Sequence, residues 1–128
     1  MEIVCSTDSK YIMPTGIMLT SLFESNRGEV VNVHLLHDQD STALLDSIRT
    51  IAARYQQNIH FYLINDDIFK HFPIGLDFQV DHVGTSFATY YRLYLTEILP
   101  ADIDKVIYLD GDILVVDKLV KLWNTSVE

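Results

Sequence analysis

The stretch KVIYLDGDILVVD, residues 105–117, decides more about this chain than any other part of its sequence. An apolar run ends there in Asp110 and Asp112, which are separated by Gly111, and a second apolar run (113–116) follows at once. Two carboxylates at the tip of a buried strand need a compensating positive charge, and a divalent cation with oxygen ligands commonly supplies it. We therefore expect a strand, a turn and a second strand, with a metal site at the turn. A solvated turn that carries two acids is the alternative.

The first half of the chain alternates between short apolar runs and segments with helical spacing of apolar residues. This alternation of strands and helices predicts an α/β fold with a mainly parallel sheet. Ligands of such sheets bind outside the carboxyl ends of the strands, so acidic residues that directly follow strands are candidate ligand-binding residues. The expected strands are 2–7, 30–36, 59–64 and 106–109, and the expected helices are 11–25 and 41–55. The acids that follow the four strands are Asp8, Asp38, Asp66 with Asp67, and Asp110 with Asp112.

The rest of the chain is less regular. Residues 66–86 contain proline and glycines and are expected to form a long loop with one helical turn near 68–72. An aromatic-rich helix is expected over 87–99, where Pro100 ends it, and another helix is expected over 119–123.

Length and composition limit the class of protein. At 128 residues the chain is one domain at most, and 48% hydrophobic residues allow a packed core. Nine basic against eighteen acidic residues give a net charge of -9, which argues against a nucleic-acid partner and suits a cation-dependent site. No apolar run reaches the roughly 18 residues of a membrane-spanning helix, and the N-terminus has no secretion signal. The single cysteine, Cys5, is expected to be a buried thiol, which weakly favours a reducing, cytoplasmic setting.

Three further residues have both a structural and a functional interpretation. Asp8 is either a helix cap or a ligand-binding acid, with capping favoured by propensity, and Tyr11 is either a core aromatic or part of a site. Arg92 lies among tyrosines and is either a stacked surface arginine or a clamp for phosphate or carboxylate. The five histidines show no metal-ligand spacing, and we expect none of them to be catalytic.

Three blocks of the sequence occur in a recognisable order and spacing: IVCSTDSKY (3–11), TSFATYYRLYLTEILP (85–100) and DKVIYLDGDILVVDKLVKLW (104–123). Together they resemble the N-terminal half of the family 8 glycosyltransferases. This group includes bacterial lipopolysaccharide galactosyl- and glucosyltransferases and, more distantly, glycogenin. The resemblance implies a GT-A fold, which is Rossmann-like. Residues 1–128 would be the N-terminal, nucleotide-sugar-binding part of the catalytic domain, without the C-terminal half that holds the acceptor.

The resemblance also implies an activity and roles for residues. The parent enzyme would transfer galactose or glucose from a UDP-sugar to a saccharide acceptor, with retention at the anomeric carbon and with Mn²⁺ or Mg²⁺. Asp110 and Asp112 would ligate the metal. Asp8 and Tyr11 would contact the nucleoside, and Arg92 would support the donor phosphates or sugar. No catalytic residue is assigned, because the family's second half supplies the groups near the anomeric carbon.

The same resemblance implies a bacterial cytoplasmic enzyme, either free or peripheral at the inner membrane. An incomplete domain would expose apolar surface, so self-association of the chain is a further expectation. Two other functions stay open from the residues alone. One is a phosphatase of the haloacid dehalogenase type, which also places Asp-x-Asp after an apolar strand. The other is a non-catalytic ion-binding or interaction fragment, which the acidic charge allows.

Overall fold

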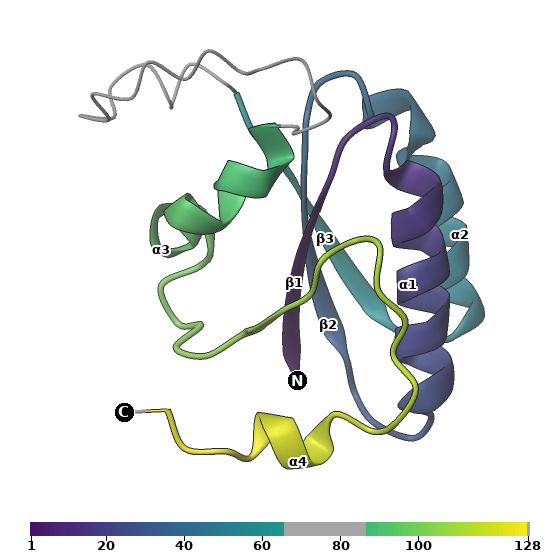
Figure 1. The fold of residues 1–128 in the computed structure, drawn as a ribbon, viewed down its shortest axis with the longest axis vertical. Coiled ribbons are helices and arrows are strands. Elements are labelled where there is room, and N and C mark those ends of the chain that lie inside the picture. The colour runs from purple at the N-terminus through teal and green to yellow at the C-terminus, as the bar shows by residue number, and fades with distance from the viewer. Residues whose placement is uncertain (66–86, 128) are drawn as a thin grey trace.

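The computed structural model of the protein describes residues 1–65 and 87–127. Its described part is built around one sheet of four parallel strands in the order β3-β2-β1-β4, as Figure 1 shows. The strands are β1 (Glu2–Thr7), β2 (Asn32–His37), β3 (Asn58–Leu63) and β4 (Ile107–Tyr108). The predicted α/β fold with a parallel sheet is therefore confirmed, and the first three strands lie within two residues of their expected bounds.

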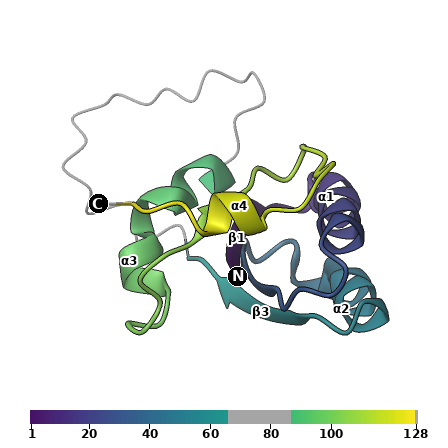
Figure 2. The same ribbon diagram turned by 90° about the horizontal axis from the view of Figure 1, so that it is seen from below.

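Helices cover the sheet on both sides, which makes three layers (Figure 2). One side carries α1 (Ile12–Ser25) and α2 (Leu45–Arg54), and the 3-10 helix η1 (Thr42–Leu44) leads into α2. The other side carries the 3-10 helix η3 (Phe87–Tyr94) and α3 (Leu95–Ile98). Helix α4 (Val120–Trp123) lies near the N-terminus of β1. The loop expected over 66–86, with Asp66 and Asp67, lies outside the described residues.

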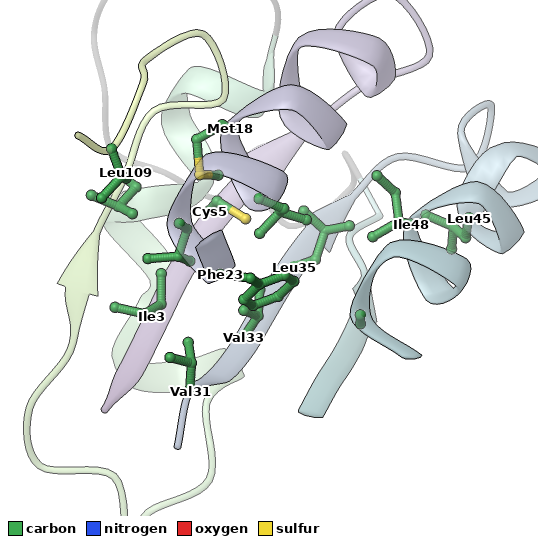
Figure 3. Packing of buried hydrophobic residues seen from close by; sticks show 14 residues of the cluster. Ile3, Cys5, Met18, Phe23, Val31, Val33, Leu35, Leu45, Ile48 and Leu109 are labelled. Atoms are coloured by element: carbon green, nitrogen blue, oxygen red, sulfur yellow. The ribbon is translucent and has the colours of Figure 1, made fainter. Parts of the chain in front are cut away.

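The larger hydrophobic core lies between the sheet and the two helices α1 and α2 (Figure 3). Ile3 and Cys5 of β1 face Met18 and Phe23 of α1, and all four side chains are almost completely buried. Strand β1 is buried on both faces, as expected of a parallel strand covered by helices on both sides. The apolar residues of β1 are therefore consecutive in sequence and do not alternate with polar ones. This pattern favours a position in the interior of the sheet.

A smaller core on the opposite face holds η3 and α3 against the sheet. Val4 of β1 and Leu36 of β2 pack under Tyr91 of η3, and the three side chains are at most 1% exposed. Leu95 and Ile98 of α3 pack on the edge of this cluster. Burial of apolar surface on this face thus fixes the helix that carries Arg92 relative to the carboxyl ends of the strands.

The predicted strand over 113–116 is wrong. The second apolar run, 113–116, is not a strand, because the backbone of Val115 bonds to serine hydroxyls of α1 instead of a neighbouring strand. Ser25 donates to the carbonyl of Val115 (2.8 Å), and the amide of Val115 donates to Ser21 (3.0 Å). In the second helical segment, Leu45 at the start of α2 is buried, whereas Leu44 at the end of the preceding 3-10 turn is 41% exposed.

No helix in the described ranges is long and apolar enough to span a bilayer.

Candidate functional site

The turn between β1 and α1 is organised by the carboxylate of Asp8. Its Oδ1 accepts hydrogen bonds from the backbone amides of Lys10 (2.8 Å) and Tyr11 (2.9 Å), and the residue is 7% exposed. Asp8 therefore stabilises the turn that leads into α1 and does not cap the helix itself, whose N-cap residue is Tyr11 and has no side-chain cap bond. The carboxylate is held rigidly at the carboxyl end of β1, at the edge where ligands of parallel sheets bind.

The turn formed by Asp110, Gly111 and Asp112 lies directly beside it. Strand β4 pairs with β1 in parallel register, and the amide of Leu109 donates to the carbonyl of Val4 at 2.8 Å. At Gly111, an added Cβ would stand 2.6 Å from Oγ1 of Thr15. The Asp110–Asp112 turn approaches helix α1 so closely that no side chain fits at position 111. Gly111 is therefore required for this approach, and the reason is steric, because its φ lies outside the left-handed region.

Two buried hydroxyls connect α1 to the end of β1. Thr15 of α1 donates from Oγ1 to Oγ1 of Thr7 at 3.0 Å, and Thr7 donates onward to the backbone carbonyl of Asp8 at 3.2 Å. Both threonines are at most 1% exposed. The sequence analysis missed them, because nothing in the pattern of a threonine within a helix shows that it packs against a glycine almost a hundred residues later.

Arg92 contacts the first carboxylate of the turn. Its Nη2 donates to Oδ1 of Asp110 at 2.9 Å, and its guanidinium lies 4.7 Å from the centre of the Tyr108 ring. The hydroxyl of Tyr108 pairs with Oγ of Ser6 at 2.6 Å. Arg92 thus both stacks on an aromatic ring and clamps a carboxylate, which joins the two interpretations that the sequence left open.

The electrostatic character of the site differs from that of the core beneath it. Burial raises the pKa of Tyr108, while the hydrogen bond with Ser6 and the charge of Arg92 oppose the rise, so its hydroxyl stays neutral near pH 7. Burial alone raises the pKa of Cys5 to about 12, so the thiol is protonated and inert, as expected. The charges of the site therefore come from Arg92 and the aspartates.

The residues present fit a divalent cation in one specific way. Asp110 and Asp112 are both exposed and flank one tight turn, and carboxylate oxygens are the ligands that Mg²⁺ and Mn²⁺ prefer. Within the described ranges, no three acidic, histidine or cysteine side chains gather closely enough to hold a metal ion. Mg²⁺ is often bound by only one or two carboxylates, with water and substrate phosphates as the other ligands. The pair suits that kind of site and not a closed protein cage.

The structure thus brings most of the predicted site residues to one edge of the sheet. Asp8 and the Asp110–Asp112 turn follow the adjacent strands β1 and β4, and Arg92 bonds to Asp110. Tyr11 follows Asp8 at the start of α1 and is 41% exposed, so it is no core aromatic. Asp38 instead caps the turn after β2, since its Oδ1 accepts from the amide of Ser41 at 2.9 Å.

Comparison with known proteins identifies the family. The model of glycosyl transferase family 8 matches residues 2–128, and the chain therefore belongs to this family. A solved structure of the galactosyltransferase LgtC, in complex with donor and acceptor sugar analogs, superposes with a TM-score of 0.75 and is 32% identical. It covers 98% of this chain, whereas the match covers 43% of LgtC. The fold is the GT-A fold of such transferases.

Curated relatives come from bacteria and plants. The probable galacturonosyltransferase-like 4 of Arabidopsis thaliana is 29% identical over 135 residues, which cover 100% of this chain and 36% of that protein. A lipopolysaccharide 1,2-glucosyltransferase of Escherichia coli is 27% identical over 107 residues, which cover 84% of this chain and 30% of that protein. The chain thus spans about a third of the length of the curated relatives it matches. Membership of family 8 favours a transferase over the phosphatase alternative.

Proposed function

We propose that this chain is the donor-binding part of a metal-dependent hexosyltransferase, which transfers galactose or glucose from a UDP-sugar to a saccharide acceptor with retention. The observation that carries the proposal is the position of the Asp110–Asp112 turn, which packs on Thr15 of α1 beside the strand that Asp8 follows and has Arg92 on Asp110. The turn places two carboxylates at the carboxyl edge of a parallel sheet, where nucleotides bind in such folds.

Different residues would bind different parts of the UDP-sugar donor. Asp110 and Asp112 would hold Mn²⁺ or Mg²⁺, which neutralises the diphosphate that leaves as the glycosidic bond breaks. Asp8 and Tyr11, on the rigid turn after β1, would contact the nucleoside, with the exposed ring of Tyr11 as a stacking surface. Arg92 would bind the donor phosphates, since its planar fork matches phosphate oxygens.

The negative charge of the donor explains why a cation is needed near these aspartates. A diphosphate carries negative charge and cannot approach Asp8, Asp110 and Asp112 without a cation between them. Holding the turns rigidly through Gly111 and Thr15 places the donor groups before the ligand arrives, which limits the ordering that binding requires. For a bacterial parent, lipopolysaccharide is the first acceptor class to test. The corresponding location would be the cytoplasm or the inner face of the membrane.

Calorimetric titration tests the proposal directly. UDP should bind this chain with Mn²⁺ and much more weakly without it. Asp110→Asn and Asp112→Asn should each weaken cation-dependent UDP binding by about tenfold or more, because even residues behind metal ligands contribute that much. Asp117→Asn is the matched control, since Asp117 is an exposed acid whose Oδ1 accepts a local bond from the amide of Lys118.

The outcomes are distinct. Equal UDP binding with and without Mn²⁺, or unchanged binding by Asp112→Asn, would refute the assignment. In the full-length parent the same two substitutions should lower sugar transfer at least ~100-fold, as removal of charge from the metal site implies.

A further inference from the structure

The contact between Arg92 and Asp110 has consequences for the order in which ligands bind. The guanidinium lies on the same carboxylate that the cation would need, with Nη2 2.9 Å from Oδ1. Both side chains are close to half exposed, at 42% for Arg92 and 54% for Asp110, so neither is locked in place by burial. Tyr108 supports the flat face of the guanidinium at 4.7 Å, and that ring is itself fixed through Ser6.

A divalent cation and a guanidinium compete for this carboxylate. A divalent cation that binds Asp110 brings its two positive charges close to the positive guanidinium of Arg92. The repulsion weakens or breaks the bond between Arg92 and Asp110. A diphosphate changes the balance, since its oxygens offer the guanidinium fork a new anionic partner. Stacking on Tyr108 uses the face of the guanidinium, so its edge can turn from one anion to another while the stacking contact persists.

The geometry points to Arg92 as the residue that makes binding of the cation and binding of the diphosphate depend on each other. Without ligands it is the counter-ion of Asp110 and disfavours the cation alone. With the diphosphate present it pairs with phosphate, and the carboxylate becomes available to the cation. Such coupling is reciprocal, so the cation strengthens diphosphate binding by the same factor. This inference rests on the proposed function.

The exposure of the pair sets the size of the effect. Exposed ion pairs contribute up to about 1 kcal/mol, which corresponds to about a fivefold change in affinity. Removing Arg92 should therefore tighten Mn²⁺ binding about two- to fivefold in the absence of UDP. With UDP present the sign should reverse, because the lost phosphate contact then weakens the ternary complex.

The test is a titration of Mn²⁺ followed by the electron paramagnetic resonance signal of the free ion, on this chain, with and without UDP. Arg92→Gln is compared with Arg27→Gln, which removes the same charge. Arg27 is a close match, because it pairs with Glu24 at 2.8 Å and lies 5.7 Å from the ring centre of Tyr55, and it follows the C-terminal end of α1, whereas the site lies at the N-terminal end of that helix. The control should leave both Mn²⁺ affinities unchanged, which separates a local effect from one of net charge.

Arg92→Lys provides a second, charge-conserving variant. It should keep Mn²⁺ affinity without UDP within about twofold of the parent chain, and it should reduce the enhancement by UDP, because lysine lacks the planar fork. Unchanged or weaker Mn²⁺ binding by Arg92→Gln without UDP would overturn the inference. Equal tightening with and without UDP would also overturn it, and so would full enhancement in Arg92→Lys.

Failure of the inference can be told from failure of the proposed function. Asp112→Asn should lose Mn²⁺-dependent UDP binding whatever Arg92 does. If Asp112→Asn binds Mn²⁺ and UDP like the parent chain, the site itself is wrong. If it loses binding while the variants of Arg92 show no change in coupling, the site stands and only the coupling role is refuted.

Discussion

Gly111→Ala should destabilise the chain by forcing the Asp110–Asp112 turn away from helix α1. The new Cβ would lie 2.6 Å from Oγ1 of Thr15, well inside the 3.0 Å that real Cβ contacts essentially never cross. Thr15 is completely buried and bonded to Thr7, so its hydroxyl cannot rotate away without losing that bond. The φ of Gly111 is compatible with alanine, so the whole cost is steric.

The expected loss is about 1–3 kcal/mol, the usual cost of overpacking a well-filled interior. In a domain of this size each kcal/mol of lost stability lowers Tm by roughly 4 °C, so Tm should fall by about 4–12 °C. The measurement is circular dichroism at 222 nm on the parent chain and on Gly111→Ala, Thr15→Ala and the double variant.

The double variant decides whether the close contact is the cause. With Oγ1 of Thr15 removed, the nearest atoms to the new Cβ are the carbonyl oxygen of Ser6 at 3.5 Å and Cβ of Thr15 at 3.7 Å, both ordinary contacts. Gly111→Ala should therefore cost less than about 0.5 kcal/mol in the Thr15→Ala background, and the two substitutions should be strongly non-additive. Additive losses would refute the reasoning, and so would a Gly111→Ala chain as stable as the parent.

Three further outcomes follow from polar and titratable groups. Burial alone would raise the pKa of Glu2, but hydrogen bonds from Asn32 and His34 outweigh it and hold the pKa below its usual range. The stability that this carboxylate contributes should be complete above about pH 4.3 and should be lost as the pH falls through the lowered native pKa. Glu2→Gln should therefore reduce the pH dependence of the unfolding free energy, measured with urea, on the acid side. Burial raises the pKa of Cys5 to about 12, so a thiol reagent at pH 8 should label it only after unfolding, and rapid labelling of the native chain would contradict its burial. Asp8→Ala should lower the unfolding free energy by about 1 kcal/mol through loss of two amide contacts, while Asp8→Asn should retain most of it, and equal losses would show that charge rather than hydrogen bonding matters.

The sequence predicted the parallel sheet well because the relevant signals are local. Consecutive apolar residues such as Ile3, Val4 and Cys5 are needed wherever a strand is covered on both faces, and they can be read without a partner. The prediction of a strand over 113–116 was wrong for the opposite reason. Its apolar residues satisfy strand propensity, but Val116 is 87% exposed and the backbone of Val115 finds its partners in two serines of α1.

The sequence by itself determined the order of the elements, the burial of Cys5 and the presence of two carboxylates at a strand tip, because apolar periodicity and residue type act over a few neighbours. Only the tertiary structure decided that Gly111 meets Thr15 and that Arg92 bonds to Asp110. These contacts join segments far apart in the chain, and they depend on strand register and helix packing rather than on local propensity. The turn that carries Asp110 and Asp112 could therefore be located from sequence, whereas Arg92 could be paired with Asp110 only in three dimensions.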